Sequence, residues 1–336
     1  MATVQNLQLI FKLIEQATSL GVVSEFLKSK GLTYSAGSWA EMYSLRIEPA
    51  VAESKLLLQD LIDLLRDVEE YGQQHIFLYK TKPTAAQDLM NRERIKSILR
   101  ATKHEDLIAQ PRMFEFPEKP SIVDVRWTTA KEDLELVMKE VLTHESLEYE
   151  STVDDGDYQK RIYKRHRTRA VNVIVLRRNG ELELRMNSRR GSSKYDEDLK
   201  AIAHRLRPFF DLNSFIPISL AKAKAKLWQD RLTLASKIRY SDLVFTNDED
   251  VSLRAYGNAM TVNVVGNKGA VDSLETFVSN DGYCDESNIW FIKGSPTPAR
   301  DIHLVLQGAA NEFAIPTQCT KADYEYVLSE LKTLNT

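Results

Sequence analysis

The chain is poor in the residues that build disulfide frameworks, fibrous proteins and disordered proteins. Its 336 residues include only two cysteines, Cys284 and Cys319, too few for a disulfide framework or a cysteine zinc cage. Ten prolines and thirteen glycines are too few and too scattered for a disordered or collagen-like chain. The sequence also lacks a run of about 18 apolar residues and a secretory signal pattern. We therefore expect no membrane association and a reducing compartment, cytoplasmic or nuclear, rather than secretion.

What is present is typical of a folded α+β protein. Hydrophobic residues make up 43% of the chain and charged residues 28%, and the length suffices for two or three domains. Apolar residues recur at helical spacing through residues 1–73, as at Leu7, Ile10, Phe11 and Ile14, which predicts an N-terminal helical bundle. Mixed, mainly antiparallel sheet domains with flanking helices are expected to follow. The predicted domains are a helical head (1–73), a central α+β domain (74–238) and a C-terminal α+β domain (239–336).

The local patterns place elements within these domains. The firmest strand prediction is a hairpin that joins residues 171–177 and 181–186, because Asn179–Gly180 favours a type I′ turn. The other predicted strands are 75–79, 121–127, 147–153, 158–165, 242–245, 251–255, 261–265, 289–292 and 302–306. Helices are predicted at 83–99, 134–142, 195–210, 219–237, 270–278 and 321–334.

Charge of one sign is concentrated in one part of the chain. Residues 160–239 contain 21 Lys and Arg against 7 Asp and Glu, a net charge of +14, although the whole chain carries only −3. The remainder has 24 basic and 41 acidic residues, a net charge of −17. A local positive field is most often used to hold a polyanion, so the pattern favours nucleic acid as a partner, with DNA favoured over RNA.

The residues of this segment differ in how well they suit phosphate. An extended strand places alternate side chains on one face, where arginine forks match phosphate geometry and a tyrosine can stack on a base. A following Arg-Arg-Gly-Ser-Ser loop offers amides and hydroxyls, and two lysines of a helix share a face while Lys224 points away. The predicted nucleic-acid-binding residues are Lys160, Arg161, Tyr163, Lys164, Arg165, Arg167, Arg169, Arg189, Arg190, Lys194, Lys222 and Lys226.

Two other interpretations of the basic segment stay open. Charge runs are usually solvated faces, and arginines on an edge strand discourage strand-to-strand aggregation. The positive segment is equally suited to dock onto the acidic helical head or onto an acidic protein partner.

No enzyme signature survives inspection, so catalytic residues, cofactors and metal ligands are not expected. The cluster Asp154, Asp155 and Asp157 around Gly156 has metal-like spacing, but DDGD is also good turn chemistry between two strands. A divergent metal-dependent nuclease would use Asp155, Asp157 and Glu183. The usual carboxylate-x-lysine arrangement is absent, because an arginine follows Glu183 two residues later.

The order of elements resembles a known family. A helical head is followed by HIFLYK (75–80), a helix at LELVMKEVL (134–142), and antiparallel strands carrying YQKRIYKRH (158–166) and AVNVIVLRR (170–178). This plan resembles centromere protein N and its fungal relatives over residues 1–210. In that family a helical head and a neighbouring basic region grip nucleosomal DNA and histone surface. The resemblance implies that Arg161, Arg165 and Arg167 lie near a nucleic-acid groove.

The sequence thus predicts a non-catalytic nucleic-acid-binding protein that neutralises phosphates and works within a larger complex. A protein-interaction scaffold is the first alternative, with a partner on the acidic head or the C-terminal domain. The nuclease is the second. A DNA-associated or defence-system role in a bacterium is equally compatible with the sequence.

Overall fold

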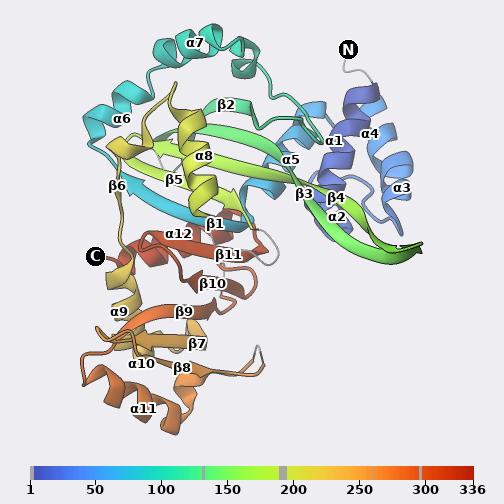
Figure 1. Ribbon diagram of the computed structural model, residues 1–336. Helices are drawn as coiled ribbons and strands as arrows, with labels where there is room; N and C mark the ends of the chain where they lie inside the picture. The colour runs from blue at the N-terminus through green and yellow to red at the C-terminus, as the bar shows by residue number, and fades with distance from the viewer. Residues whose placement is uncertain (1–3, 131–132, 189–194, 260, 295–296) are drawn as a thin grey trace.

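The strands of the chain form one large antiparallel sheet that the N-terminal helices precede, which confirms the expected α+β class (Figure 1). The computed structural model describes residues 4–130, 133–188, 195–259, 261–294 and 297–336. The strand order is β2-β3-β4-β5-β1-β11-β10-β9-β7-β8, and β6 pairs with β1. None of the helices within those residues has the length and apolar character needed to span a membrane. The strands are β1 (Gly72–Lys80), β2 (Ser121–Ala130), β3 (Asp133–Asp155), β4 (Tyr158–Arg177), β5 (Glu181–Asn187), β6 (Ile216–Pro217), β7 (Ile238–Thr246), β8 (Ser252–Tyr256), β9 (Tyr283–Phe291), β10 (Ile302–Leu306) and β11 (Glu312–Gln318).

Five α-helices and the π-helix Tyr43–Ile47, all within the described N-terminal residues, form a head with a hydrophobic core of its own. Ile10 and Ile14 of the first helix pack with Leu27, Leu61 and Leu65, and all five side chains are buried. The apolar residues lie three or four positions apart, so they share one stripe on each helix. The helices of the head are α1 (Val4–Ala17), α2 (Leu20–Ser29), α3 (Trp39–Met42), α4 (Glu48–Ala52) and α5 (Leu58–Glu70).

One face of the β2–β5 half of the sheet is apolar and is covered by three helices. Leu136 and Met138 of β3 and Ile174 of β4 belong to this buried cluster, together with Phe209 and Phe210 after the third helix. The covering helices are α6 (Pro83–Leu89), α7 (Arg92–Ala101) and α8 (Asp196–Leu206).

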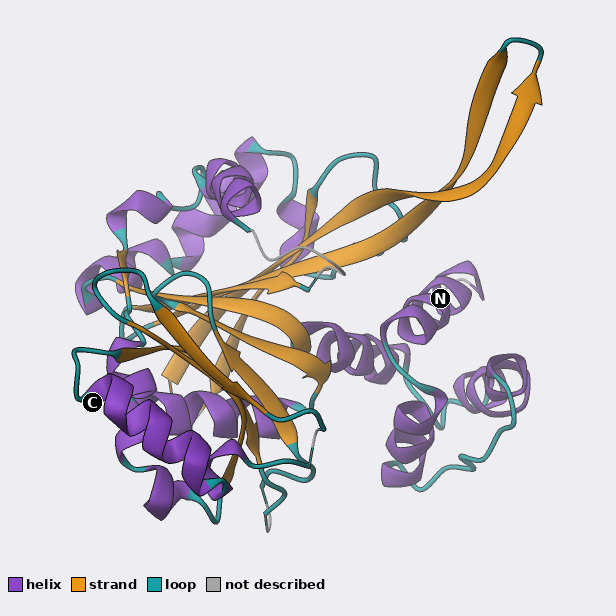
Figure 2. Cartoon of the chain, turned by 60° about the horizontal axis from the view of Figure 1, so that its bottom comes forward, coloured by secondary structure: helices purple, strands orange, loops and turns teal. Residues whose placement is uncertain are grey.

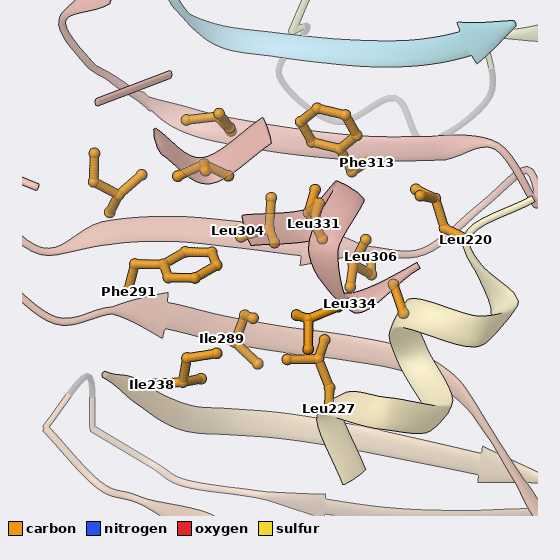
Figure 3. Close-up of a cluster of buried hydrophobic side chains, with 14 of the residues drawn as sticks. Leu220, Leu227, Ile238, Ile289, Phe291, Leu304, Leu306, Phe313, Leu331 and Leu334 are labelled. Atoms are coloured by element: carbon orange, nitrogen blue, oxygen red, sulfur yellow. The ribbon is translucent and has the colours of Figure 1, made fainter. Parts of the chain in front are cut away.

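The other half of the sheet has its core on the opposite face. Ile289 and Leu304 pack against Leu331 and Leu334 of α12 (Lys321–Leu334) and against Leu227 of α9 (Ala221–Gln229), as Figure 3 shows. Two further helices are α10 (Arg231–Leu234) and α11 (Lys268–Val278). Because β1 pairs with both β5 and β11, the sheet is continuous from residues of the central segment to those of the C-terminal segment. The division at 238/239 stays a prediction.

The helix predicted at 134–142 is wrong, since these residues lie in strand β3. Residues 135–141 of this strand are buried on both faces, so they show no apolar–polar alternation that would mark a strand in the sequence. Glu135 and Lys139 occupy helix-like i, i+4 positions, yet both are buried and take ion-pair partners from other elements, Arg177 and Glu69. The spacing of the buried residues Glu135 and Lys139 therefore matches that of the polar stripe of a helix, although both lie in a strand.

Two details of the C-terminal segment also differ from expectation. Residues 261–265 form no strand, and Val264–Gly266 is a short 3-10 helix beside the Asn263 amide, whose oxygen accepts from the Tyr240 N–H at 3.1 Å. Strand β11 was not predicted, because Pro316 lies inside it. Ile315 is paired with Gln74 of β1, and the register between the two strands becomes irregular directly after this pair, between Gln74 and Gly72. Pro316 lies at this irregularity, where a missing N–H is tolerated.

The hairpin at Asn179–Gly180 is confirmed, but its turn is not type I′. A type I′ turn needs positive φ at both central residues, whereas here Gly180 alone has it, at +95°. The N–H of Gly180 donates to the carbonyl of Arg177 at 3.0 Å, three residues back. A side chain at Gly180 would overlap the carbonyl oxygen of Thr81, so the glycine is required by space as well as by φ.

Candidate interaction arm

The outer halves of β3 and β4 leave the sheet as a two-stranded arm (Figure 2). β2 pairs with β3 only as far as Val141, and β5 pairs with β4 only as far as Val173. Residues 145–167, which we call the arm, pair with each other across a turn at Gly156, whose φ is +62°. At about 3.3 Å per residue, the arm reaches about 33 Å from its base. The prediction that DDGD is a turn between two strands is confirmed.

The register of the hairpin gives the arm two different faces. Tyr149 lies opposite Tyr163 on one face, and their rings meet nearly edge to face with centroids 6.0 Å apart. Leu147 lies opposite Arg165 on the same face. A bulge at Glu150 shifts β3 by one residue, while β4 stays regular. The opposite face carries Val153, Tyr158 and Ile162.

Both faces of the arm expose large apolar side chains to solvent. Tyr158 is 76% exposed and Leu147 64% exposed. Four more exposed side chains of this kind complete the set: Tyr149, Val153, Ile162 and Tyr163. A two-stranded ribbon without other packing is at best marginally stable in water, and contiguous exposed apolar groups mark interaction sites. The arm is therefore the strongest candidate for a recognition element among the described residues.

The charges of the arm are completely segregated between its strands. The β3 side and the turn carry Glu145, Glu148, Glu150, Asp154, Asp155 and Asp157, without a Lys or Arg. The β4 side carries Lys160, Arg161, Lys164, Arg165 and Arg167, without an Asp or Glu. With six acidic and five basic residues, the arm has a net charge of −1. The basic strand found in the sequence thus lies against an acidic one that offsets it.

Several of these charges neutralise each other on the arm itself. Arg167 donates to Glu145 at 2.9 Å, and Arg165 lies 3.5 Å from the same carboxylate. Lys160 pairs with Asp155. All these side chains are exposed, and each such pair contributes about 0–1 kcal/mol. Elsewhere on the arm, Arg161 and Lys164 form no ion pair with any described residue.

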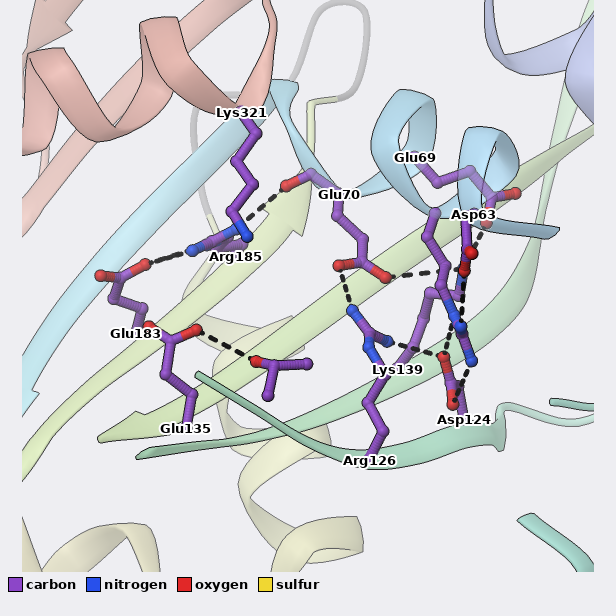
Figure 4. A network of polar contacts seen from close by, with 12 residues as sticks. Asp63, Glu69, Glu70, Asp124, Arg126, Glu135, Lys139, Glu183, Arg185 and Lys321 are labelled. Atoms are coloured by element: carbon purple, nitrogen blue, oxygen red, sulfur yellow. Dashed lines mark hydrogen bonds and ion pairs between the residues drawn. The ribbon is translucent and has the colours of Figure 1, made fainter. Parts of the chain in front are cut away.

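Arg169, the next residue on the predicted basic face, is not available to a ligand. Its guanidinium is 7% exposed, pairs with Glu69 of α5 and donates to the carbonyl of Phe114 at 2.8 Å. Lys139 of β3 donates to the same Glu69 carboxylate at 2.7 Å (Figure 4). At Arg169 the basic segment contacts the acidic head, which is one of the interpretations that the sequence left open.

The contact between α5 and the sheet continues as a buried ionic layer that sequence reasoning missed. Glu70 accepts from Arg126, and Arg66 donates to Asp124 at 2.9 Å. Deleting one member of such a pair leaves an uncompensated buried charge, so the layer fixes how the head sits on the sheet. The one sequence feature that points to this layer is the pair of acidic residues Glu69 and Glu70, which stands at the end of the helical head just before the first strand.

Further basic residues of the 160–239 segment lie inside the fold. Arg177 and Arg185 both pair with Glu183, and Arg205 pairs with Glu140. Burial alone would raise the pKa of Glu183, but the two guanidinium groups outweigh it and hold that pKa well below its usual range. Arginines that raised the net charge of the segment thus serve internal ion pairs.

The remaining predicted residues are scattered. Lys222 and Lys226 lie on α9, and Lys222 donates to the carbonyl of Thr336 at 3.5 Å. Their helix packs over the C-terminal half of the sheet, away from the arm (Figure 1). Lys224 is buried, in line with its expected position on the other side of α9. Arg189, Arg190 and Lys194 lie outside the described residues.

The three carboxylates of the nuclease alternative do not come together. Asp155 and Asp157 lie at the tip of the arm, whereas Glu183 is buried in β5 opposite Val175. The tip and Val175 are 17 residues apart along β4, about 56 Å of extended strand. No group of His, Cys, Asp and Glu within the described part of the chain is arranged to hold a metal ion.

Comparison with protein-family models, with curated proteins and with solved structures finds no match for this chain. The resemblance to centromere protein N stays a prediction.

Proposed function

We propose that the chain is a non-catalytic binding protein that recognises another protein through the arm. The observation that carries this proposal is the combination on one projecting ribbon of exposed apolar side chains on both faces and charges of both signs. Apolar and aromatic groups supply the central contacts of protein interfaces, and surrounding charges set partner choice and orientation. The proposal develops the scaffold interpretation of the sequence rather than its phosphate-binding interpretation.

The charge of the arm favours a protein over a polyanion. Binding to nucleic acid draws most of its free energy from neutralised phosphates and released counterions. A ribbon with six acidic and five basic residues repels phosphates about as strongly as it attracts them. A protein groove that presents both signs has no such penalty, since each strand of the arm meets its complement.

The size of the arm indicates that the partner surrounds it. Strands lie about 4.8 Å apart, so a ribbon about 10 Å wide and 33 Å long offers about 330 Å² on each face. A standard interface buries about 800 Å² per partner, more than one face supplies. Insertion of the arm into a groove, with contacts to both faces and to the open strand edges, approaches that area. Open edges also permit main-chain pairing with a partner strand.

A second candidate, DNA binding, rests on one specific observation. Arg161 and Lys164 are exposed and have no ion-pair partner among the described residues, and Tyr163 lies between them. The major groove admits a two-stranded ribbon, so Arg161 and Tyr163, which share one face of β4, are positioned to meet a groove, and Lys164 on the other face is positioned to meet a flanking phosphate. This candidate retains the core of the sequence prediction and narrows it to the arm.

One experiment separates the two candidates. A photo-crosslinking amino acid is placed at Tyr163 on the arm, which is 45% exposed, and, as a control, at the more accessible Leu232 on α10, which is 78% exposed. After irradiation in the cells that make the protein, the adducts are treated with protease or with nuclease. We expect an adduct at position 163 but not at 232, sensitive to protease and resistant to nuclease.

Each other result decides against the proposal. A nuclease-sensitive adduct at position 163 would establish the DNA candidate in its place. Equal adducts at both positions, or none at position 163, would show that the arm has no specific partner.

A further inference from the structure

A polar pocket of about 450 Å³ lies beside the ionic layer and plays no part in the proposed function. Its floor is formed by Val137 of β3 and Val175 of β4, on the sheet face that α5 covers. One wall is α5 with Asp67 and Glu70, and Lys321 at the start of α12 lies across from it. The volume suits a ligand with the size of an amino acid or a short amine.

The guanidinium groups around the pocket have their donors occupied within the protein. Arg185 donates Nε and Nη2 to Glu183, at 3.0 and 2.6 Å, and Nη1 to the carbonyl of Glu70. Arg126 donates to Asp124 and Glu70. Arg66 donates to Asp124 and to Asp63 of its own helix. An anionic ligand would therefore compete with internal carboxylates for every guanidinium.

Acceptors, in contrast, are left free. The side chain of Glu70 is 3% exposed, and its Oε1 has no hydrogen-bond partner. The Nζ of Lys139 lies 3.9 Å from this oxygen, beyond hydrogen-bonding distance, and Arg126 donates to the other oxygen of the carboxylate. Asp67, one turn before Glu70, forms no ion pair with any described residue. A buried carboxylate oxygen without a donor is costly, so the site gains from a ligand that supplies one.

The pKa of Asp67 agrees with a carboxylate that lacks a cation partner among the described residues. Burial and the neighbouring Glu70 carboxylate raise the pKa of Asp67, and the opposing effects of Lys321 and Arg126 are smaller. Lys321 lines the pocket, is exposed, and lies 4.0 Å from Glu325 on its own helix. The wall formed by α5 thus presents Asp63, Asp67 and Glu70 to the pocket against the single cation Arg66, whose donors go to Asp63 and Asp124.

We infer that this pocket binds an organic cation, an amine or a guanidinium group, through Asp67 and Glu70. The donors of the cation would reach the free oxygen of Glu70 and both oxygens of Asp67, while its carbon chain lies over Val137 and Val175. Two sources have this chemistry: a free small amine, and a Lys or Arg side chain of another protein.

Thermal unfolding with added ligands tests the site. The probes are agmatine and 1,4-diaminobutane for free amines, and an arginine tripeptide blocked at both ends for a protein side chain, with acetate as the anionic control. We expect at least one cationic probe to raise the Tm saturably and acetate to leave it unchanged. Agmatine binding tighter than the peptide indicates a free ligand, and the reverse order indicates a side chain.

Substitution of Asp67 tests whether the rise in Tm comes from binding of the cation in this pocket. Asp67→Asn removes one acceptor charge without uncovering a buried partner, so the variant is expected to fold. We expect it to weaken the affinity for the cation at least tenfold, whereas Asp248→Asn, an exposed change in a distant loop, leaves the affinity unchanged. The inference is overturned if no cation raises the Tm saturably, or if Asp67→Asn binds as tightly as the unchanged protein.

Discussion

The contact of α5 with the sheet is predicted to depend on Glu69, whose carboxylate bridges two buried cations. Its side chain is 2% exposed, Lys139 is 5% exposed and Arg169 is 7% exposed. Glu69→Gln keeps the shape of the side chain but leaves Arg169 without its counter-charge and Lys139 with only the Glu70 carboxylate, 3.9 Å away. Breaking a buried pair in this way costs about 3–5 kcal/mol. The matched control is Glu145→Gln, which removes a carboxylate that also bridges two arginines but is 42% exposed, and its expected cost is about 0–1 kcal/mol.

Urea unfolding followed by circular dichroism measures this difference. With a slope near 3 kcal/mol/M, Glu69→Gln is expected to lower the midpoint by about 1 M or more, and Glu145→Gln by about 0.3 M or less. If the two variants unfold at the same midpoint, the ionic layer does not hold the head on the sheet. The account of Arg169 as a structural residue would then be wrong.

Three further predictions follow from buried or strained groups. Burial and Glu70 raise the pKa of Asp67 in the folded state, so ionisation of this carboxyl destabilises the fold as the pH rises above its ordinary pKa of about 3.9. Asp67→Asn should therefore raise the Tm at pH 7. At pH 3, where the carboxyl of the unchanged protein is protonated, the variant and the unchanged protein should have the same Tm. Burial raises the pKa of Cys319 to about 12, so iodoacetamide at pH 8 should label this thiol only after unfolding, as mass spectrometry of native and denatured protein will show. Gly180→Ala combines a positive φ with an overlap on the Thr81 carbonyl, and is expected to cost at least about 1 kcal/mol in urea unfolding.

Local patterns predicted those parts of the fold in which one face of an element meets water. The head and α12 have apolar stripes at helical spacing, and the Asn179–Gly180 dipeptide marked its hairpin correctly. Strand β3 escaped detection because tertiary partners bury its charged residues. No local pattern indicates that Glu135 and Lys139 will find Arg177 and Glu69 from other elements.

The candidate site was located only in part, for a similar reason. The alternation of β4 predicted a shared face that includes Arg161, Tyr163, Arg165 and Arg167, and β4 is a regular strand through these positions. The net charge of the sequence segment reflects β4 alone. In the fold, the acidic strand β3 lies beside β4 across the hairpin and sets its electrostatic environment. Net charge over 80 residues also could not separate arginines in buried pairs, such as Arg169, from those on the surface.

Shortening the arm tests the central claim most directly. Residues 146–166 are replaced by a short glycine-containing turn, and the full and shortened chains are compared by size-exclusion chromatography in native extract, with and without nuclease. Because the arm packs against little else, we expect both chains to have nearly the same Tm, the full chain to elute in a nuclease-resistant complex, and the shortened chain to elute as the free protein. A complex of unchanged size with the shortened chain, or one that nuclease dissolves, would contradict recognition of a protein through the arm.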